Sequence, residues 1–353
     1  MKNFLLIFQL LLLVMCMSNC NQTESTSSIK VPKKEKDVFP VRQDLSLLKT
    51  TAFVPTLESM LPKEKNVFYS STFLLAWSGL IKILKYEHIS KTNYPDDFNK
   101  INESKSFINS LNKDDFETKV ELIKSEIHVK THFKFNLPFE YPLEEINNRL
   151  KFKNKPVEAF GLTGHDLMFN DIVSLIYYKN DENCILKLLP KDKNHEIILA
   201  KGLNSKGNLL EYVNEIQDRN SLRASEKKND PSNLSFHGED ELIIPKLKFN
   251  LETNYNQIEG QNFMCAYGIF RVVKAQQSIA LILDHKGAII ESEAEAAAAA
   301  AADTQVFKKK IIYFDQPFFI LMKKKDQPFP YFAGWINDTS CMTIKKEKEI
   351  NSK

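Results

Sequence analysis

Two histidines, His128 and His132, have the spacing of a metal-binding pair on a helix, where residues four apart share one face. Their segment alternates apolar and polar residues from Ile127 to Phe135, which predicts a half-buried strand instead. On a strand, residues four apart are separated by about 13 Å, too far to share one ion. We therefore expect two solvated side chains, with no metal and no cofactor.

Other catalytic signatures are missing. The sequence contains no phosphate-binding glycine loop, no GxSxG nucleophile elbow, no HExxH pair and no GxGxxG fingerprint. Adjacent carboxylates occur at Asp96–Asp97 and Asp114–Asp115, but both pairs lie in polar stretches that predict solvated surface. Catalytic triads can assemble from distant residues, yet nothing in the sequence points to one. The sequence predicts a protein that is not an enzyme.

Cysteine chemistry is limited in the same way. Cys16 and Cys20 belong to an apolar leader, which leaves Cys184, Cys265 and Cys341, an odd number with wide spacing. This pattern excludes a disulfide framework and a zinc site, and it permits at most one bridge.

The N-terminus predicts export. Lys2 is followed by an apolar run to Met17 and by small residues, which is typical of a secretory signal peptide over residues 1–20. A membrane anchor is the alternative, but the run is short for a bilayer span. N-glycosylation sequons begin at Asn21, Asn102, Asn233 and Asn337, as expected of a secreted, extracellular glycoprotein.

Composition predicts one folded domain. The chain has 353 residues with 43% hydrophobic and 26% charged residues, which is ordinary for a globular protein. We expect a disordered leader over 21–40, a single domain over 41–345 and a charged tail over 346–353. The net charge is only +3, which gives no electrostatic case for nucleic acid or an acidic membrane, and we expect a monomer.

Hydrophobic periodicity predicts helices mainly in the first third of that domain. We expect helices over 45–61 and 72–84, the second with a buried stripe, with a strand at 66–70 between them and partly helical structure over 86–115. Strands are predicted at 172–178, 184–189, 196–200, 242–251, 278–283, 311–322 and 331–336. A short helix at 209–216 precedes a charged loop over 222–240. Helices followed by many strands predict an α+β fold.

One segment stands apart from this pattern. Residues 291–302 are almost entirely alanine and glutamate, and a basic run, Lys308–Lys310, follows them. Alanine favours helix over strand, so a helix or a low-complexity spacer is one interpretation of this segment.

Three blocks resemble the serpin family. Asn66–Ser71 resembles the family's strand before its second helix, and Leu242–Phe249 resembles its LPKF strand. The third block runs from Ser278–Asp284 through the alanine-rich segment to Phe314–Ile320 and Phe332–Gly334. The resemblance implies large β-sheets, N-terminal helices and an exposed reactive-centre loop at about 287–312. It also implies a suicide substrate of trypsin-like or chymotrypsin-like serine proteases.

The resemblance assigns roles to loop residues. The hinge, whose side chains must be small if it inserts between strands, comprises Glu291, Glu293, Ala294, Glu295, Ala296, Ala297, Ala298, Ala299 and Ala300. The scissile candidates are Val306, Phe307 and Lys308. Phe307 suits a chymotrypsin-like enzyme and Lys308 a trypsin-like one. A solvated charge run is the alternative interpretation of the lysines.

The sequence also departs from the family. Ser71 stands where serpins have proline, and Gln277 where they usually have histidine. Several dozen residues are missing between Asn66 and Pro245, including helices that cover the main sheet. In a second register the hinge begins at Asp284–Gly287, which would bring bulky Ile289 and Ile290 into the inserting segment. A non-inhibitory binding or carrier protein is therefore the alternative function.

Overall fold

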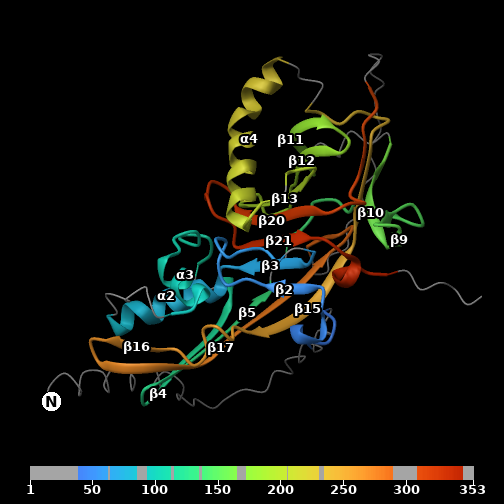
Figure 1. Cartoon of the computed structure of the whole chain (residues 1–353). Coiled ribbons are helices and arrows are strands. Elements are labelled where there is room, and N and C mark those ends of the chain that lie inside the picture. Colours follow the sequence, from blue (N-terminus) through green and yellow to red (C-terminus); the bar gives the residue numbers. More distant parts are fainter. Residues whose placement is uncertain are drawn as a thin grey trace, which may run out of the picture. The chain divides into compact units, whose positions relative to one another are not determined.

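The computed structural model describes residues 39–62, 64–85, 94–112, 115–134, 137–164, 172–204, 206–229, 234–288 and 308–344. Three sheets of four or more strands carry most of these residues, and three α-helices lie against them (Figure 1). The predicted α+β class is confirmed. The described residues all fall within one contact unit, which spans 38–353.

Sheet I has six strands. Its order is β1 (Gln43–Asp44), β15 (Leu247–Asn254), β17 (Gly268–Leu283), β5 (Glu126–Lys134) and β4 (Glu117–Ile123), with β16 (Asn262–Cys265) pairing to β17. The pairs β15–β17 and β4–β5 are antiparallel, whereas β17–β5 in the middle is parallel. A two-residue turn, Lys124–Ser125, joins β4 directly to β5.

Sheet II has seven strands. Its order is β11 (Val173–Asn180), β12 (Asn183–Leu188), β13 (His195–Lys201), β20 (Phe318–Lys324), β21 (Phe332–Ile336), β3 (Asn66–Ser70) and β2 (Thr51–Phe53). Strands β3 and β13 are buried along their whole length, because this sheet is covered on both faces.

Sheet III has four strands in the order β19 (Ile311–Tyr313), β14 (Glu241–Pro245), β10 (Ala159–Thr163) and β7 (Glu144–Ile146). Two short ribbons complete the strands: β18 (Gly287–Ala288) with β6 (Leu137–Pro138), and β8 (Lys151–Phe152) with β9 (Lys155–Pro156). Two 3-10 turns lie at Leu45–Leu47 and Thr339–Cys341.

Aromatic side chains fill the space between sheets I and II. Phe68 of β3 lies 4.5 Å, centroid to centroid, from Phe249 of β15. Phe133 of β5 stacks on Phe332 of β21 at 5.8 Å. The abundance of phenylalanine in the sequence, 25 residues, thus supplies large contact areas between two packed sheets.

The helices cover other faces. Helix α2 (Thr72–Leu84) buries the predicted stripe of Phe73, Trp77, Leu80 and Leu84, and ends at Lys85 in the left-handed region. Helix α3 (Asp96–Glu103) packs on it through Phe98. Helix α4 (Leu209–Asn229) stacks Tyr212 on Phe319 and Trp335 of sheet II. None of these described helices is long and apolar enough to cross a membrane.

The outer face of sheet I, turned away from sheet II, is polar. Lys119 and Glu121 of β4 and Lys130 of β5 point to this face and are largely solvent-accessible. The three described helices have their partners elsewhere. A direct turn joins β4 to β5, and the polar residues on this face need no cover.

Several predicted elements are wrong in extent. The helix over 45–61 is instead a 3-10 turn and strand β2, because Pro55 interrupts the segment and Thr50–Thr51 favour strand. The loop predicted over 222–240 begins as the second half of α4. The strand over 242–251 breaks at Lys246 into β14 and β15, and that over 311–322 breaks before Pro317 into β19 and β20.

Candidate functional site

The candidate site is the seam between β5 and β17, in the middle of sheet I. The two strands pair in parallel from Glu126 opposite Arg271 to Lys134 opposite Ala280, with one bulge near Val272. Parallel pairing is slightly less stable per residue than antiparallel pairing. Both strands have antiparallel partners on their other sides, so each is expected to be held less firmly across the seam than on its other edge.

A short strand already lies at the open end of the seam. After β17 the chain turns back, with Asp284 bridging Gly287, and β18 then pairs antiparallel with β6, which continues β5. Gly287 lies opposite Pro138 and Ala288 opposite Leu137, so the chain at Ala288 points down toward the seam. β18 therefore lies between β6 and the residue that follows β17.

β18 has a hydrogen-bonded neighbour on each side. Ala288 pairs with Leu137 of β6, and Gly287 bridges Asp284, which directly follows β17. At the same end of the seam, Lys134 of β5 and Ala280 of β17 are partners.

Gly287 is required at this turn. Its φ of +117° lies in a region that favours glycine, and a Cβ there would fall 2.5 Å from the carbonyl oxygen of Leu137. The turn was noted in the sequence as a second possible start of the hinge, and the structure forms a tight turn there.

A buried hydrogen-bond network lies beneath the seam. The Nε2 of Gln277 donates to the Thr72 hydroxyl at 2.8 Å and to the Ser70 carbonyl at 3.1 Å, and the Tyr255 hydroxyl donates to its Oε1. The Thr72 hydroxyl also reaches the Thr131 hydroxyl at 3.5 Å. Burial raises the pKa of Tyr255 well above its usual value, so the phenol stays a donor. The network ties β3, α2 and both seam strands together.

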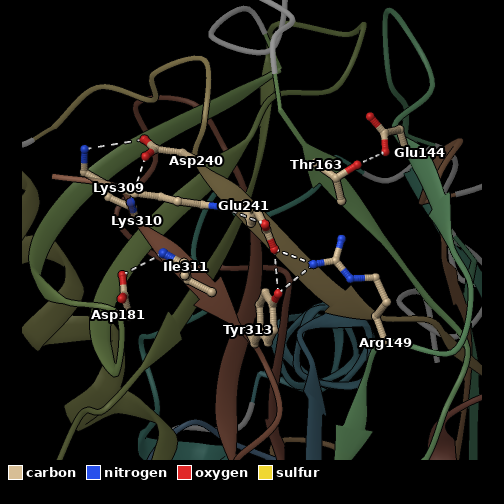
Figure 2. Close-up of polar contacts among 10 residues, drawn as sticks. All are labelled: Glu144, Arg149, Thr163, Asp181, Asp240, Glu241, Lys309, Lys310, Ile311 and Tyr313. Atoms are coloured by element: carbon tan, nitrogen blue, oxygen red, sulfur yellow. Dashed lines mark hydrogen bonds and ion pairs between the residues drawn. The ribbon is translucent and has the colours of Figure 1, made fainter. Parts of the chain in front are cut away.

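Residues Lys308–Tyr313 begin the last described range, and we call them the root segment. Three carboxylates accept hydrogen bonds from this segment. Asp240 accepts the backbone N–H of Lys310 at 2.8 Å, and Asp181 accepts that of Ile311 at 3.0 Å. Glu241 accepts from the Lys309 ammonium at 2.9 Å (Figure 2). We call Asp181, Asp240 and Glu241 the carboxylate clamp.

Lys310 is buried within the clamp. Its side chain is 5% exposed, its Nζ donates to the Ser235 carbonyl at 2.8 Å, and Asp240 lies 3.6 Å away. A buried ammonium needs such partners, because an unpaired charge away from water is costly. Lys310 is therefore fixed in place, whereas Lys308 and Lys309 remain exposed.

Glu241 is the centre of the charged contacts around β19. The Tyr313 hydroxyl, Lys309 and Arg149 all donate to its carboxylate, and these donors lower its pKa to about 2. It is ionised across the whole physiological range, so the clamp keeps its charge there.

The predicted loop residues lie mostly outside the part of the chain that the structure describes. This holds for the hinge residues Glu291, Glu293 and Glu295, for Ala294 and Ala296–Ala300, and for the scissile candidates Val306 and Phe307. Lys308, the third candidate, is described and exposed. What the sequence interpretation missed was β18, which only the Asp284–Gly287 turn signals, and the clamp, whose members are far apart in the chain.

The described sequons carry structural contacts. The side chain of Asn102 accepts from Trp77 Nε1 at 3.0 Å and donates to the Phe98 carbonyl. Asn337 is 8% exposed, and its Oδ1 accepts from Lys153. Glycosylation at either residue would disturb these contacts, whereas Asn21 and Asn233 are not among the described residues.

His128 and His132 both lie on β5, as predicted. Among the described residues, no group of three or more metal-ligating side chains occurs. Cys184, Cys265 and Cys341 are free thiols, and burial raises the pKa of Cys184 and of Cys341 to about 12. Asp97 and Asp115, predicted as solvated, instead bond to Ser59 and Lys324.

No protein-family model and no curated protein matches the sequence. Among solved structures, the chain is similar to a serpin of the insect Tenebrio molitor, described as highly specific, with TM-score 0.35 and 17% identity over 60% of this chain. A serpin of Schistosoma mansoni matches with TM-score 0.35 and 15% identity over 61%. The matches span 55% and 56% of those two chains.

Proposed function

We propose that this chain is a secreted serpin-type inhibitor of trypsin-like or chymotrypsin-like serine proteases, exported by the signal peptide at 1–20. The protease attacks the loop between Ala288 and Lys308, and its serine forms an ester with the new carboxyl end while the amine end departs. The freed hinge then enters the seam between β5 and β17 before water hydrolyses the ester. No catalytic residue on this chain takes part.

The observation that carries the proposal is the register of β18. Gly287 and Ala288 are bonded as an antiparallel strand that points toward a parallel pair. Insertion would replace one parallel pairing by two antiparallel ones, which are slightly more stable per residue. It would also add backbone hydrogen bonds along the entire segment.

The side-chain pattern of the segment fits this course. If the segment inserted in the register of β18, the positions that would face sheet II are Ser292, Ala294, Ala296 and Ala298. Small side chains on that face meet little resistance above the buried network and aromatic core. Alanine has a low intrinsic preference for β-strands, but packing context routinely overrides that preference.

One sequence feature favours the non-inhibitory alternative. If the segment after Ala288 inserted in the register of β18, Ile290 would face inward beside Leu281, a buried residue near the open end of the seam. A bulky side chain there would slow entry and give water time to release the protease. The chain would then behave as a substrate or as a binding protein.

The test is incubation with a panel of trypsin-like and chymotrypsin-like proteases, followed by denaturing electrophoresis. An inhibitor gives a complex that survives denaturation, because the ester bond persists. Cleavage of the loop with no such complex across the panel would contradict inhibition and support the substrate-like alternative.

A further inference from the structure

Strand β4 forms one edge of sheet I, on the side away from β15 (Figure 1). It pairs with β5 on one side, and none of the described strands pairs with its other side. The outward row of backbone N–H and C=O groups on such an edge is a template for one more strand. The partner that this edge fits can be inferred from the side chains of β4.

The edge exposes apolar side chains. Val120 and Leu122 of β4 lie opposite Val129 and Ile127 of β5, so they share the inner face of the sheet. The β5 residues are fully buried, whereas Val120, Leu122 and the neighbouring Ile123 are exposed. Because an exposed apolar edge strand is prone to pair with another chain, β4 is a candidate interaction surface.

The charged side chains of β4 lie on the outer face. Lys119 and Glu121 are 65% and 41% exposed, and their side chains form an ion pair of 2.8 Å with each other. Lys119 lies directly opposite Lys130 of β5, and like charges in this position are destabilising. An acidic side chain on the open side of Lys119 would offset that repulsion.

The strand is complementary to itself in charge. When two copies of β4 pair antiparallel over all seven residues, Val120 lies opposite Val120 and Lys119 lies opposite Glu121 of the other copy, twice. A shift by two residues sets Lys119 against Lys119 or Glu121 against Glu121. A shift by one residue sets apolar side chains of one copy beside charged ones of the other. The full-length register is thus the one in which both faces match.

We infer that β4 pairs with β4 of a second copy of this chain, in a two-fold symmetric dimer that continues sheet I from one copy to the other. A lysine within an edge strand opposes pairing with most other strands, but here Glu121 supplies the opposite charge. Two-fold pairing makes each contact twice, as is usual in homodimers. The inference is independent of loop insertion, and it replaces the monomer that we expected from the sequence.

Charge reversal tests the inference, with the molar mass of the intact, uncut protein measured over a range of concentrations. One edge pairing is small compared with the roughly 1,200 Å² that stable interfaces bury, so we expect a weak dimer. Lys119→Glu and Glu121→Lys each replace two attractive rows by two repulsive ones. We expect each variant to raise the dissociation constant about tenfold. Lys248→Glu, exposed on β15 in the same sheet, is the matched control and should not change it.

Mixing the two variants is the sharper measurement. In a dimer of Lys119→Glu with Glu121→Lys, both charged rows are again attractive, so the mixture should associate more tightly than either variant alone. Amide exchange in β4 should also slow as the wild-type concentration rises, whereas exchange in β2, at one end of sheet II, should not change. Both side chains are exposed, so the variants should fold. A wild type that stays monomeric, a dimer that neither reversal weakens, or a mixture that fails to recover would overturn the inference.

Discussion

Thr131 of β5 and Gln277 of β17 lie opposite each other in the seam, and both hydrogen-bond to the hydroxyl of Thr72 beneath them. A strand inserted between them would double their separation, from about 4.8 Å to about 9.6 Å between strands. Thr72 could not then reach both. The longer bond, 3.5 Å to Thr131 against 2.8 Å to Gln277, is the one expected to break.

The Thr131 contact should therefore act as a latch on the seam. We predict that Thr131→Val costs at most about 1 kcal/mol of unfolding free energy, because it removes one weak bond, and that it speeds insertion after the loop is nicked. Urea unfolding and the time course of heat resistance measure the two effects. An unchanged or slower insertion rate would contradict the latch.

Gln277 should behave differently. Gln277→Leu leaves the Tyr255 hydroxyl and the Ser70 carbonyl buried without their partner, so we predict a loss of about 1–3 kcal/mol in unfolding free energy. Gln276→Leu, on the outer face of the same strand, is the control and should cost clearly less. Equal losses of unfolding free energy in the two variants would show that the buried network adds no stability beyond that of the outer-face glutamine.

The turn at Gly287 gives a third prediction. Gly287→Ala combines a positive φ with a steric clash against the Leu137 carbonyl, so the turn should open and β18 should separate from β6. We expect the free energy of unfolding to fall by about 1–3 kcal/mol and insertion to be markedly slower. Gly260→Ala, which has a similar φ but open space around its Cβ, is the control for strain alone. Insertion as fast as in the wild type would contradict a role for β18 as the seed strand.

The carboxylate clamp sets the limit of proteolysis on the C-terminal side of the loop. A protease must draw the substrate backbone into its cleft, and the backbone amides of Lys310 and Ile311 are held by Asp240 and Asp181. We predict that limited trypsin digestion yields C-terminal fragments that start no later than Lys309. N-terminal sequencing of the fragments checks this.

The matched variants for the clamp are Asp240→Asn, Asp181→Ala and Glu239→Gln. Either of the first two should permit cuts after Lys309 or Lys310, whereas Glu239, exposed and adjacent, should leave the fragment pattern unchanged. Wild-type fragments that begin at Ile311 would contradict the clamp, whatever the variants do.

His195 predicts a pH dependence of stability. Its ring is 7% exposed, Nδ1 lies 3.1 Å from the Tyr331 hydroxyl, and Asp192, Asp115 and Lys324 surround it. Burial lowers the pKa of His195 below 6.5, so the unfolded chain takes up a proton before the folded chain does. Its contribution to stability is present above pH 6.5 and is lost as the pH falls through the folded pKa.

We therefore expect the urea midpoint to fall between neutral and mildly acidic pH, and His195→Gln to reduce that fall. His128→Gln, on the outer face of sheet I, serves as the control. An identical pH dependence in the wild type and His195→Gln would show that His195 does not cause the loss of stability at acidic pH.

Much of this architecture could be predicted from the sequence. The stripe of α2 and the alternation along β5 are strong local patterns, and both are confirmed. The Ser278–Leu283 strand was found but is only the end of β17, because its first half is polar and flanked by a bulge. Local periodicity carries no information on which strands pair, so the parallel seam could not be predicted.

The candidate site was predictable only in outline. The hinge composition predicted an inserting strand, but the pairing of Gly287 and Ala288 with β6 joins segments that are far apart in the sequence. The clamp joins Asp181, Asp240 and Glu241 from three regions of the chain, and no sequence pattern links them. Both features are contacts between residues that are far apart in the sequence, and neither the types nor the spacing of these residues signals them.

The central claim is that the segment after Ala288 enters the seam once the loop is cut. The most direct measurement is the melting temperature of the purified protein before and after nicking the loop at Lys308. The account predicts a large rise, accompanied by slower amide exchange in β5 and β17 as each gains a new strand partner. An unchanged or lower melting temperature, with exchange in both strands as before, would contradict insertion.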